Sequence, residues 1–415
     1  MRFPKIQCIQ QKRNSTHILN LKSLIKEKLV RFQIQDYISP GDSIGLTASS
    51  RGIKNQAIIL KTIVKFLKNL KTQPFIIPAM GSHAGGTATG QKRLLHNYGI
   101  TEENIGCPIK ATMKVVEIAK SEFGDPLYID KYAASADKII IINKIKTHSK
   151  FYGDVESGLT KMCLMGLGKR KGAKLYHQII AQHSWDEISK SFRKSILQNV
   201  PIICGIGVIQ NSYNEIAEIH ILSPEEFETK EPQLLKRYKE IQMGIPFKEI
   251  DLLIVDEMGK NIFGTGMDTN ITGRKLNSEM NVQWLFVRDL TEETHGNAQG
   301  IGLADFTTKR VIDKIDISQT YVNALTAFRT DSAKLPIHFP TDKDVLKEIL
   351  KLASFKEPSE FRLVWIKNTL ELDRLLVSEY FFDKVASRDD LTIIEKPESL
   401  SFDKYGFLIN STNYW

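Results

Sequence analysis

A lysine and two histidines stand in an unusual setting in the run THSKFYGDVESGLTKMCLMGLGKRKGAKLYH. Lys161 is the one charged residue of its apolar, glycine-rich part GLTKMCLMGLG, with His148 before it and His177 after it. Such a lysine either extends its amine to water along its apolar stem or is desolvated, so that the neutral amine can bond to a cofactor. His177 is a candidate metal ligand, but one imidazole without cysteine or carboxylate partners needs ligands from elsewhere.

Two further candidates, Arg51 and His83, share with His148 a position shortly after an apolar run that predicts a buried strand. Ligands of open parallel sheets bind beyond the carboxyl ends of the strands, so we expect these three side chains at one sheet edge. The alternatives are local: a cap or ion pair for Arg51, and a tight turn between glycines for His83. The loop GSHAGG is neither a GxGxxG nor a Walker motif and is weak evidence for a nucleotide.

Two loops in the second half of the chain offer further polar side chains. The run GKNIFGTGMDTN contains Lys260, Asp268 and Asn270, and the run THGNAQG contains His295 and Asn297. They are candidates for substrate contacts. The alternative is a pair of glycine-rich turns with capping side chains.

A basic cluster follows Lys161. It comprises Lys169, Arg170, Lys171 and Lys174. Such a cluster either attracts a cofactor phosphate or an acidic substrate, or forms a solvated loop, and the solvated loop is the more common case.

The pattern of strands and helices around these residues predicts an α/β fold with a largely parallel sheet in the N-terminal part. Apolar runs separated by helical periodicity indicate four strands, at residues 43–48, 74–80, 138–143 and 202–209. Between the strands we expect helices, among them 90–97 and 187–197.

The length of 415 residues favours two domains. After a polar helix at 225–243, residues 250–259 begin a new series of strands, which VQWLFVRDL and FRLVWIKN continue. We therefore expect an N-terminal α/β lobe of residues 1–246, a C-terminal α/β lobe of residues 247–415, and an active-site cleft between them. The C-terminal tail can pack on its own lobe or back on the first.

Composition is that of an ordinary globular protein, with 42% hydrophobic and 25% charged residues. The sequence shows neither a membrane-spanning run nor a secretory signal, so we expect a cytoplasmic protein. The four cysteines form no CxxC pair and predict buried free thiols. The net charge of +9 is spread along the chain without a nucleic-acid motif, so small anionic ligands explain it as well.

The stretch NKIKTHSKFYGDVESGLTKM, with the following GLGKRKGA run and His177, resembles the lactate racemase family, which uses a nickel-pincer nucleotide. Supporting stretches are SSRGIKNQA, PFIIPAMGSHAGGTATGQ, DEMGKNIFGTGMDTNITGR and TEETHGNAQGIGLADFTT, so the resemblance runs from about residue 40 to about residue 340. The chain looks closest to the broader isomerase branch of that superfamily. It departs from the lactate enzyme in two places: Ala48 stands where that enzyme has an aspartate three residues before the arginine, and the segment from His148 to Lys161 is a few residues longer.

The resemblance implies a cofactor, pyridinium-3-thioamide-5-thiocarboxylic acid mononucleotide with Ni(II), joined through a thioamide to a lysine. By that resemblance Lys161 is the tether and His177 completes a planar four-ligand nickel site, with Ser157 and Gly158 as further cofactor contacts. The cofactor supplies three of the four nickel ligands, so the single imidazole of His177 is enough to complete the site.

The family interconverts configurations at a hydroxyl-bearing carbon by moving a proton and a hydride. By the resemblance His83 and His148 are the acid and base, a task that suits imidazole near neutral pH. Arg51 would bind a carboxylate through two parallel hydrogen bonds. We expect a racemase or epimerase of a 2-hydroxy acid or related hydroxylated compound.

The expected partners are a small hydroxy-acid substrate and cofactor-maturation enzymes, with a homo-oligomer possible and neither nucleic acid nor membrane. Two other functions stay open. A nicotinamide-dependent oxidoreductase would share the α/β fold and a histidine acid/base, but the first strand lacks a GxGxxG motif after it. A non-catalytic protein would bind the cofactor or another phosphorylated anion.

Overall fold

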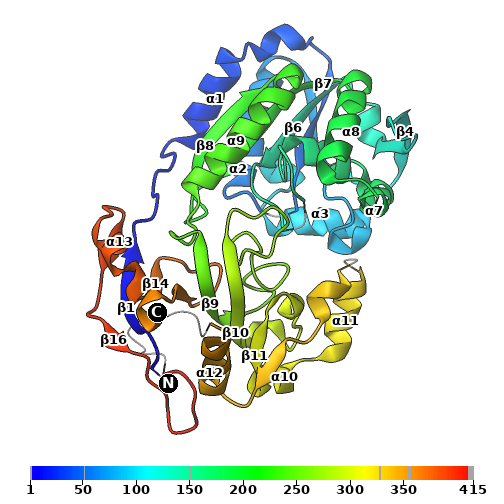
Figure 1. Cartoon of the computed structure of the whole chain (residues 1–415). Helices are drawn as coiled ribbons and strands as arrows, with labels where there is room; N and C mark the ends of the chain where they lie inside the picture. The colour runs from blue at the N-terminus through cyan, green and yellow to red at the C-terminus, as the bar shows by residue number, and fades with distance from the viewer. Residues whose placement is uncertain are drawn as a thin grey trace. The chain divides into compact units, whose positions relative to one another are not determined.

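The computed structural model describes residues 2–50, 52–149, 151–180, 182–326, 329–353 and 357–409. The chain divides into two compact units, one of residues 14–242 and the other of residues 1–13 with 243–415 (Figure 1). The division after residue 242 lies close to the predicted boundary at 247. The first thirteen residues, however, belong with the C-terminal residues, whereas the sequence had assigned them to the N-terminal lobe.

The unit of residues 14–242 is built on a five-stranded sheet with the order β3-β2-β6-β7-β8. β2, β3, β6 and β7 are parallel, and β8 is antiparallel to β7. The strands are β2 (Ser43–Ala48), β3 (Gln73–Pro78), β6 (Lys138–Lys144), β7 (Ile202–Gln210) and β8 (Ile216–Leu222). The four predicted strands are therefore confirmed, and the sheet is largely parallel as expected.

Helices cover this sheet, and separate apolar clusters form on its two faces. On one face α1 and α2 pack their leucines and isoleucines on the strands, and on the other α8 and α9 do so. The helices and the small hairpin of this unit are α1 (Leu21–Arg31), α2 (Gln56–Asn69), α3 (Ala88–Asn97), α4 (Glu102–Ile105), β4 (Val115–Lys120), β5 (Pro126–Asp130), α5 (Lys131–Ala134), α6 (Leu159–Lys161), α7 (Lys169–Ile179), α8 (Trp185–Asn199) and α9 (Phe227–Ile241).

The second unit contains a nine-stranded mixed sheet with the order β12-β11-β10-β9-β13-β14-β1-β15, and β16 pairs with β1. The strands from β12 to β13 are parallel, and β14, β1, β15 and β16 continue antiparallel. The strands are β1 (Lys5–Gln11), β9 (Glu249–Met258), β10 (Asn281–Leu290), β11 (Phe306–Thr308), β12 (Ile337–Phe339), β13 (Leu363–Ile366), β14 (Arg374–Ser378), β15 (Leu391–Ile393) and β16 (Glu398–Ser399). The helices are α10 (Lys309–Lys314), α11 (Ile317–Thr326), α12 (Asp342–Leu352) and α13 (Phe382–Ala386).

Both ends of the chain meet in this second unit. β1 lies between β14 and β15, and Phe3 packs against Phe402 with ring centroids 5.2 Å apart. The tail as far as residue 409 thus belongs to the same unit as the strands of the second sheet. The last six residues lie outside the described part of the chain.

Two expectations from composition can be compared with the structure. All four cysteines are buried free thiols, as predicted. Burial raises the pKa of the Cys163 thiol, which disfavours its thiolate form. Among the described residues, the structure contains no helix with the length and apolar character to cross a membrane.

Candidate functional site

The loop after β6 is closed at its base by backbone hydrogen bonds. Lys146 and Ser157 exchange two of them, at 2.8 and 3.1 Å, in an antiparallel bridge. The Asn143 side chain donates to the Gly158 carbonyl at 2.7 Å. A Cβ at Gly158 would lie 2.2 Å from a carboxylate oxygen of Glu231, so any larger residue there would displace that carboxylate. The predicted cofactor contacts Ser157 and Gly158 therefore form the base of the loop that carries His148.

Phe151 is buried in this loop and contacts three of the predicted site residues. The His148 ring stacks on it with centroids 4.1 Å apart, and His148 Nδ1 accepts a hydrogen bond from Phe151 N at 3.1 Å. The Lys161 amine lies 5.3 Å from the centroid of the same ring, and the His177 ring centroid lies 6.2 Å from it. Trp185 of α8 stacks on Phe151 at 4.3 Å. One aromatic ring thus gathers His148, Lys161 and His177.

Lys161 ends α6 and directly precedes a π-helical turn, Met162–Gly166. π-helical turns are rare in proteins, and those that do occur are often found at functional sites. The fully buried carboxylate of Glu231, on α9, accepts hydrogen bonds from Thr160 N at 3.2 Å and from the Thr160 hydroxyl at 2.6 Å. Burial raises the pKa of Glu231, and the hydrogen bonds from Thr160 oppose that shift. No local pattern indicates this contact, because Glu231 lies 71 residues further along the chain than Thr160.

The basic cluster is divided by the fold. Arg170, Lys171 and Lys174 are exposed on α7. The Lys169 side chain is fully buried and pairs with Asp130 at 3.0 Å. A buried ammonium that is already paired with a carboxylate is not available to a phosphate. For Lys169 both predicted roles, a phosphate attractor and a solvated loop residue, are therefore wrong.

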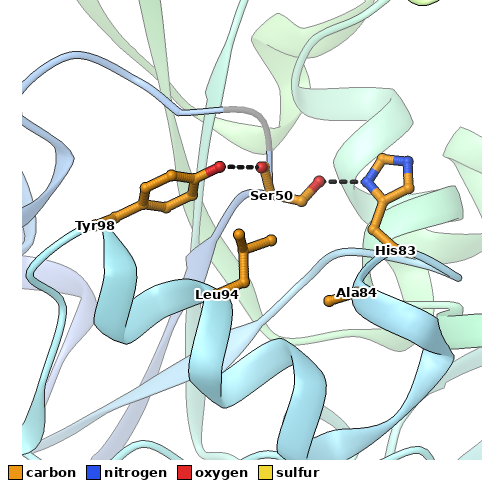
Figure 2. A pocket seen from close by; sticks show the side chains of 5 residues that line it. All are labelled: Ser50, His83, Ala84, Leu94 and Tyr98. Atoms are coloured by element: carbon orange, nitrogen blue, oxygen red, sulfur yellow. Dashed lines mark hydrogen bonds between the residues drawn. The ribbon is translucent and has the colours of Figure 1, made fainter. Parts of the chain in front are cut away.

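His83 lies in an open pocket of about 440 Å³, lined by Ser50, His83, Ala84, Leu94 and Tyr98 (Figure 2). The Ser50 hydroxyl and His83 Nδ1 form a hydrogen bond, and the Tyr98 hydroxyl donates to the Ser50 carbonyl at 2.7 Å. Ser50 follows β2 and His83 follows β3, so two neighbouring parallel strands bring this pair together. His83 is a candidate from the sequence, whereas Ser50 is not, although Ser50 directly precedes Arg51.

The loop of His83 packs on the segment between Lys161 and His177. Gly81 N donates to the Gly166 carbonyl at 3.2 Å. A Cβ at Gly81 would lie 2.8 Å from the Met165 carbonyl oxygen, and one at Gly166 would lie 2.9 Å from the Ala79 oxygen. These glycines let two backbones approach closely, which joins the His83 loop to the π-helical turn after Lys161.

Arg51, the predicted carboxylate-binding residue, lies outside the described residues. Ala48, three residues before Arg51 in the sequence, ends β2 and is fully buried. The Ala48 carbonyl accepts a hydrogen bond from Ala79 N at 2.9 Å. The position at which the lactate enzyme has an aspartate is therefore an apolar core position in this chain.

The predicted substrate contacts of the second unit lie in two adjoining loops after β9 and β10. Lys260 N donates to Thr294 Oγ1 at 3.2 Å, and Thr294 Oγ1 donates to the Asn297 carbonyl at 2.7 Å. The Asn297 side chain accepts a hydrogen bond from Gln299 N, as a turn cap does. His295 is exposed and adopts a φ of 50°. The structure brings Lys260, His295 and Asn297 into one loop cluster; substrate contact by these residues stays a prediction.

Asp268 and Asn270, from the same glycine-rich loop, form a local turn. The Asp268 carboxylate accepts from Asn270 N at 2.9 Å and from the Asn270 side chain at 2.7 Å. Lys275 donates to the Asn270 side-chain oxygen at 3.1 Å. These contacts match the capping alternative.

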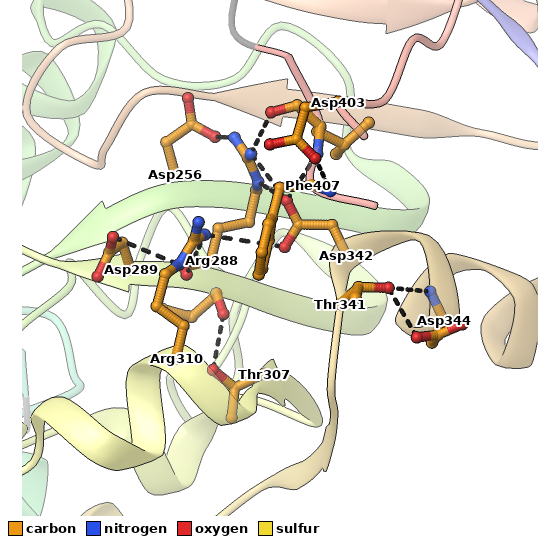
Figure 3. Close-up of polar contacts among 12 residues, drawn as sticks. Asp256, Arg288, Asp289, Thr307, Arg310, Thr341, Asp342, Asp344, Asp403 and Phe407 are labelled. Atoms are coloured by element: carbon orange, nitrogen blue, oxygen red, sulfur yellow. Dashed lines mark hydrogen bonds and ion pairs between the residues drawn. The ribbon is translucent and has the colours of Figure 1, made fainter. Parts of the chain in front are cut away.

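A buried charge network in the second unit was not anticipated from the sequence. Arg288 of β10 pairs with Asp256 and, at 2.8 Å, with Asp342 at the start of α12 (Figure 3). The same arginine donates to the Leu408 carbonyl at 2.8 Å, and Leu408 N donates to Asp342 at 2.9 Å. Arg310 lies over the Phe407 ring, 4.4 Å from its centroid. The network fastens the C-terminal tail to the sheet.

The residues around Phe151 fit the implied nickel-pincer nucleotide. The described parts of the chain contain no group of three or more His, Cys, Asp or Glu side chains that could hold a metal. A group that brings three of its own donors needs one imidazole and one amine nearby, and His177 and Lys161 both lie against the Phe151 ring. The buried aromatic surroundings suit a planar ring system.

The protein is of the α/β class and has two units. Each unit is built on a sheet that contains parallel strands, with loops at their carboxyl ends. Residues 10–189 match the family described as the lactate racemase N-terminal domain. The matched segment includes the loop of His83, the loop of His148, Lys161 and His177. The resemblance inferred from the sequence is confirmed at the level of the family.

A solved structure shares the fold across most of the chain. The lactate racemase apoprotein from Thermoanaerobacterium thermosaccharolyticum is similar with a TM-score of 0.52 and 14% sequence identity, over 82% of this chain and 91% of that chain. At this identity the likeness shows a common fold. No curated protein matches the sequence.

Proposed function

We propose that the protein is an isomerase, a racemase or epimerase of a 2-hydroxy acid or related hydroxylated compound, with a nickel-pincer nucleotide tethered to Lys161. The observation that carries the proposal is the contact of Lys161, His177 and His148 with the one buried ring of Phe151. The family of residues 10–189 supports it. In this proposal Lys161 holds the cofactor, His177 supplies the protein ligand to nickel, and Ser157 and Gly158 are further cofactor contacts.

Two histidines move the hydroxyl proton in the proposed reaction, one for each orientation of the substrate. When bound, the cofactor supplies a hydride acceptor and donor. His148 Nδ1 accepts from a backbone N–H, which leaves the proton of the neutral imidazole on Nε2. His83 Nδ1 faces a hydroxyl, which can donate or accept, so either tautomer of His83 keeps its hydrogen bond with Ser50. Arg51 binds the substrate carboxylate.

The substrate is expected to differ from lactate in the group that reaches β2. Ala48 offers no polar atom beyond its backbone, and Ala48 is fully buried. The polar side chains Lys260, His295 and Asn297 are proposed to select the substrate from the second unit. With these assignments the proposed activity is that of the broader branch of nickel-pincer-dependent isomerases, and the substrate is not lactate itself.

The test is the covalent state of Lys161 in protein matured with the cofactor-synthesis enzymes. We expect intact-mass and peptide spectra to show a nickel-bearing adduct on Lys161 in the natural protein and in the exposed control variant Lys174→Ala. In Lys161→Ala we expect no adduct, and interconversion of hydroxy-acid stereoisomers at the background rate. Full activity of Lys161→Ala, or the absence of an adduct from matured natural protein, would refute the proposal. An adduct with nickel but no turnover on a panel of chiral hydroxy acids would favour a carrier.

A further inference from the structure

The ammonium of Lys169 is held inside the protein by three separate elements. Lys169 begins α7, and its side chain has no exposed surface. Its Nζ donates to the Pro78 carbonyl at the end of β3, lies 3.0 Å from Asp130 at the end of β5, and lies 3.4 Å from Gln91 Oε1 on α3. The lysine thereby connects the end of the strand that precedes His83 with the start of the helix that carries His177.

Gln91 extends the connection to the His83 loop. Its side chain is buried, and its Nε2 donates to the Gly81 carbonyl at 3.0 Å and to the His83 carbonyl at 3.4 Å. An ammonium can only donate, so Lys169 requires the oxygen of the Gln91 amide to face it. The amide nitrogen must then face the loop. The charge of Lys169 therefore determines which way Gln91 points and what it can hold.

Maintaining this arrangement has a cost in stability. Burial lowers the pKa of Lys169 and raises the pKa of Asp130, and the attraction between the two opposes both shifts. Lys169 also adopts a φ of 55°, a left-handed backbone conformation that is strained for a residue with a side chain. Apolar packing of the same volume would often be no less stable than a buried ion pair. The buried lysine instead provides a defined geometry, because its ammonium makes directed contacts with Pro78, Asp130 and Gln91.

We propose that Lys169 is a positioning residue, which holds the His83 loop in place against the segment that carries Lys161 and His177. It acts through Pro78 and Gln91 and does not contact the cofactor. The catalytic consequence rests on the proposed function, whereas the effect on the loop does not.

The first test removes both charges and measures the loop in protein without cofactor. Lys169→Met removes the ammonium and keeps an unbranched side chain one atom shorter. Asp130→Asn keeps the cap on α5, where Asp130 Oδ1 accepts from Tyr132 N at 2.7 Å. In the double variant we expect backbone amides of residues 79–87 to exchange with deuterium roughly tenfold to a hundredfold faster, as the loss of a charge-assisted hydrogen bond implies. Peptides from β6 and β7 should keep their rates, and the exposed Lys174→Met should change neither region.

A second variant covers the case in which the double variant does not fold. Gln91→Met keeps the Lys169 and Asp130 pair and the contact of Lys169 with Pro78, and removes only the link to the loop through Gln91. A local increase of the same kind is therefore expected. Unchanged exchange of residues 79–87 in a folded variant would overturn the proposal. An equal increase throughout the unit of residues 14–242 would also overturn it, because it would mean that the pair stabilises the fold and positions nothing.

Loaded protein supplies the catalytic arm of the test. The Lys161 adduct should persist in Gln91→Met, while kcat falls by roughly tenfold to a hundredfold and KM changes little, because His83 is misplaced but substrate binding remains. A natural protein without turnover would refute the proposed function alone, since the exchange measurements do not depend on it.

Discussion

Phe151 is the residue around which three candidate functional side chains lie. The sequence pointed to His148, Lys161 and His177 by type and by resemblance, and all three contact the Phe151 ring in the structure. Nothing in the pattern distinguished Phe151 from Tyr152 beside it. The difference is one of burial, since Phe151 is 1% exposed and Tyr152 is 40% exposed.

Ser50 is the residue whose removal should affect His83 most directly. We expect Ser50→Ala to lower kcat by about twofold to tenfold, because the His83 ring loses the hydrogen bond at Nδ1 that orients it. Ser50→Thr keeps a hydroxyl and should restore most of the rate. The measurement is steady-state kinetics in both directions, together with the imidazole nitrogen shifts of His83 by NMR.

The control for this prediction is Ser82→Ala, because Ser82 is exposed and precedes His83. It should leave both the kinetics and the His83 nitrogen shifts unchanged. Equal behaviour of the Ser50 and Ser82 variants would show that the Ser50 hydroxyl does not orient the histidine.

The elements of the first unit bring loops together at the carboxyl ends of β2, β3 and β6. Their apolar runs could be recognised in the sequence, and β2 has the predicted bounds. The π-helical turn Met162–Gly166 and the antiparallel bridge below His148 could not, because both depend on contacts with other segments. The close approach of the His83 loop to that turn is likewise a tertiary feature, and it depends on glycine.

Gly81→Ala tests that close approach. Gly81 has a φ of 56°, and a Cβ there would lie 2.8 Å from the Met165 carbonyl oxygen. Gly99 is the matched control, with a φ of 72° and nothing within 4 Å of the added Cβ. We expect both substitutions to pay the backbone strain, and Gly81→Ala to lower the free energy of unfolding by about 2 kcal/mol more, because of overpacking. Urea unfolding measures the difference, and equal losses would mean that the two backbones separate without cost.

At the scale of the whole molecule, the chain begins in one unit, forms the other, and then returns. The return follows from the pairing of β1 with β14 and β15, which places the first residues beside strands from the far end of the chain. The active-site cleft expected between lobes stays a prediction. The Arg288 network shows the same long-range character, because it joins β9, β10, α12 and the tail.

Ile9→Ala tests the membership of β1. Ile9 is fully buried in the core of the second unit, so its truncation should cost roughly 2–5 kcal/mol there. Hydrogen exchange should accelerate in peptides from β14 and β15 and stay unchanged in peptides from β6 and β7. The control is Leu19→Ala, ten residues further on, because Leu19 is 90% exposed. Faster exchange in β6 with β14 unaffected would contradict the assignment of β1.

The sequence by itself determined the α/β class and the parallel strands of the first sheet, because apolar periodicity is a local property, and it pointed to the lysine and the histidines by residue type and by resemblance. Tertiary structure decided that Lys169 is buried, that Glu231 holds Thr160, that Ser50 meets His83 and that β1 joins the other unit. Each of these depends on a partner distant in the chain. Whether a charged side chain faces water or a buried carboxylate is set by the segments that fold over it, and no local pattern records that.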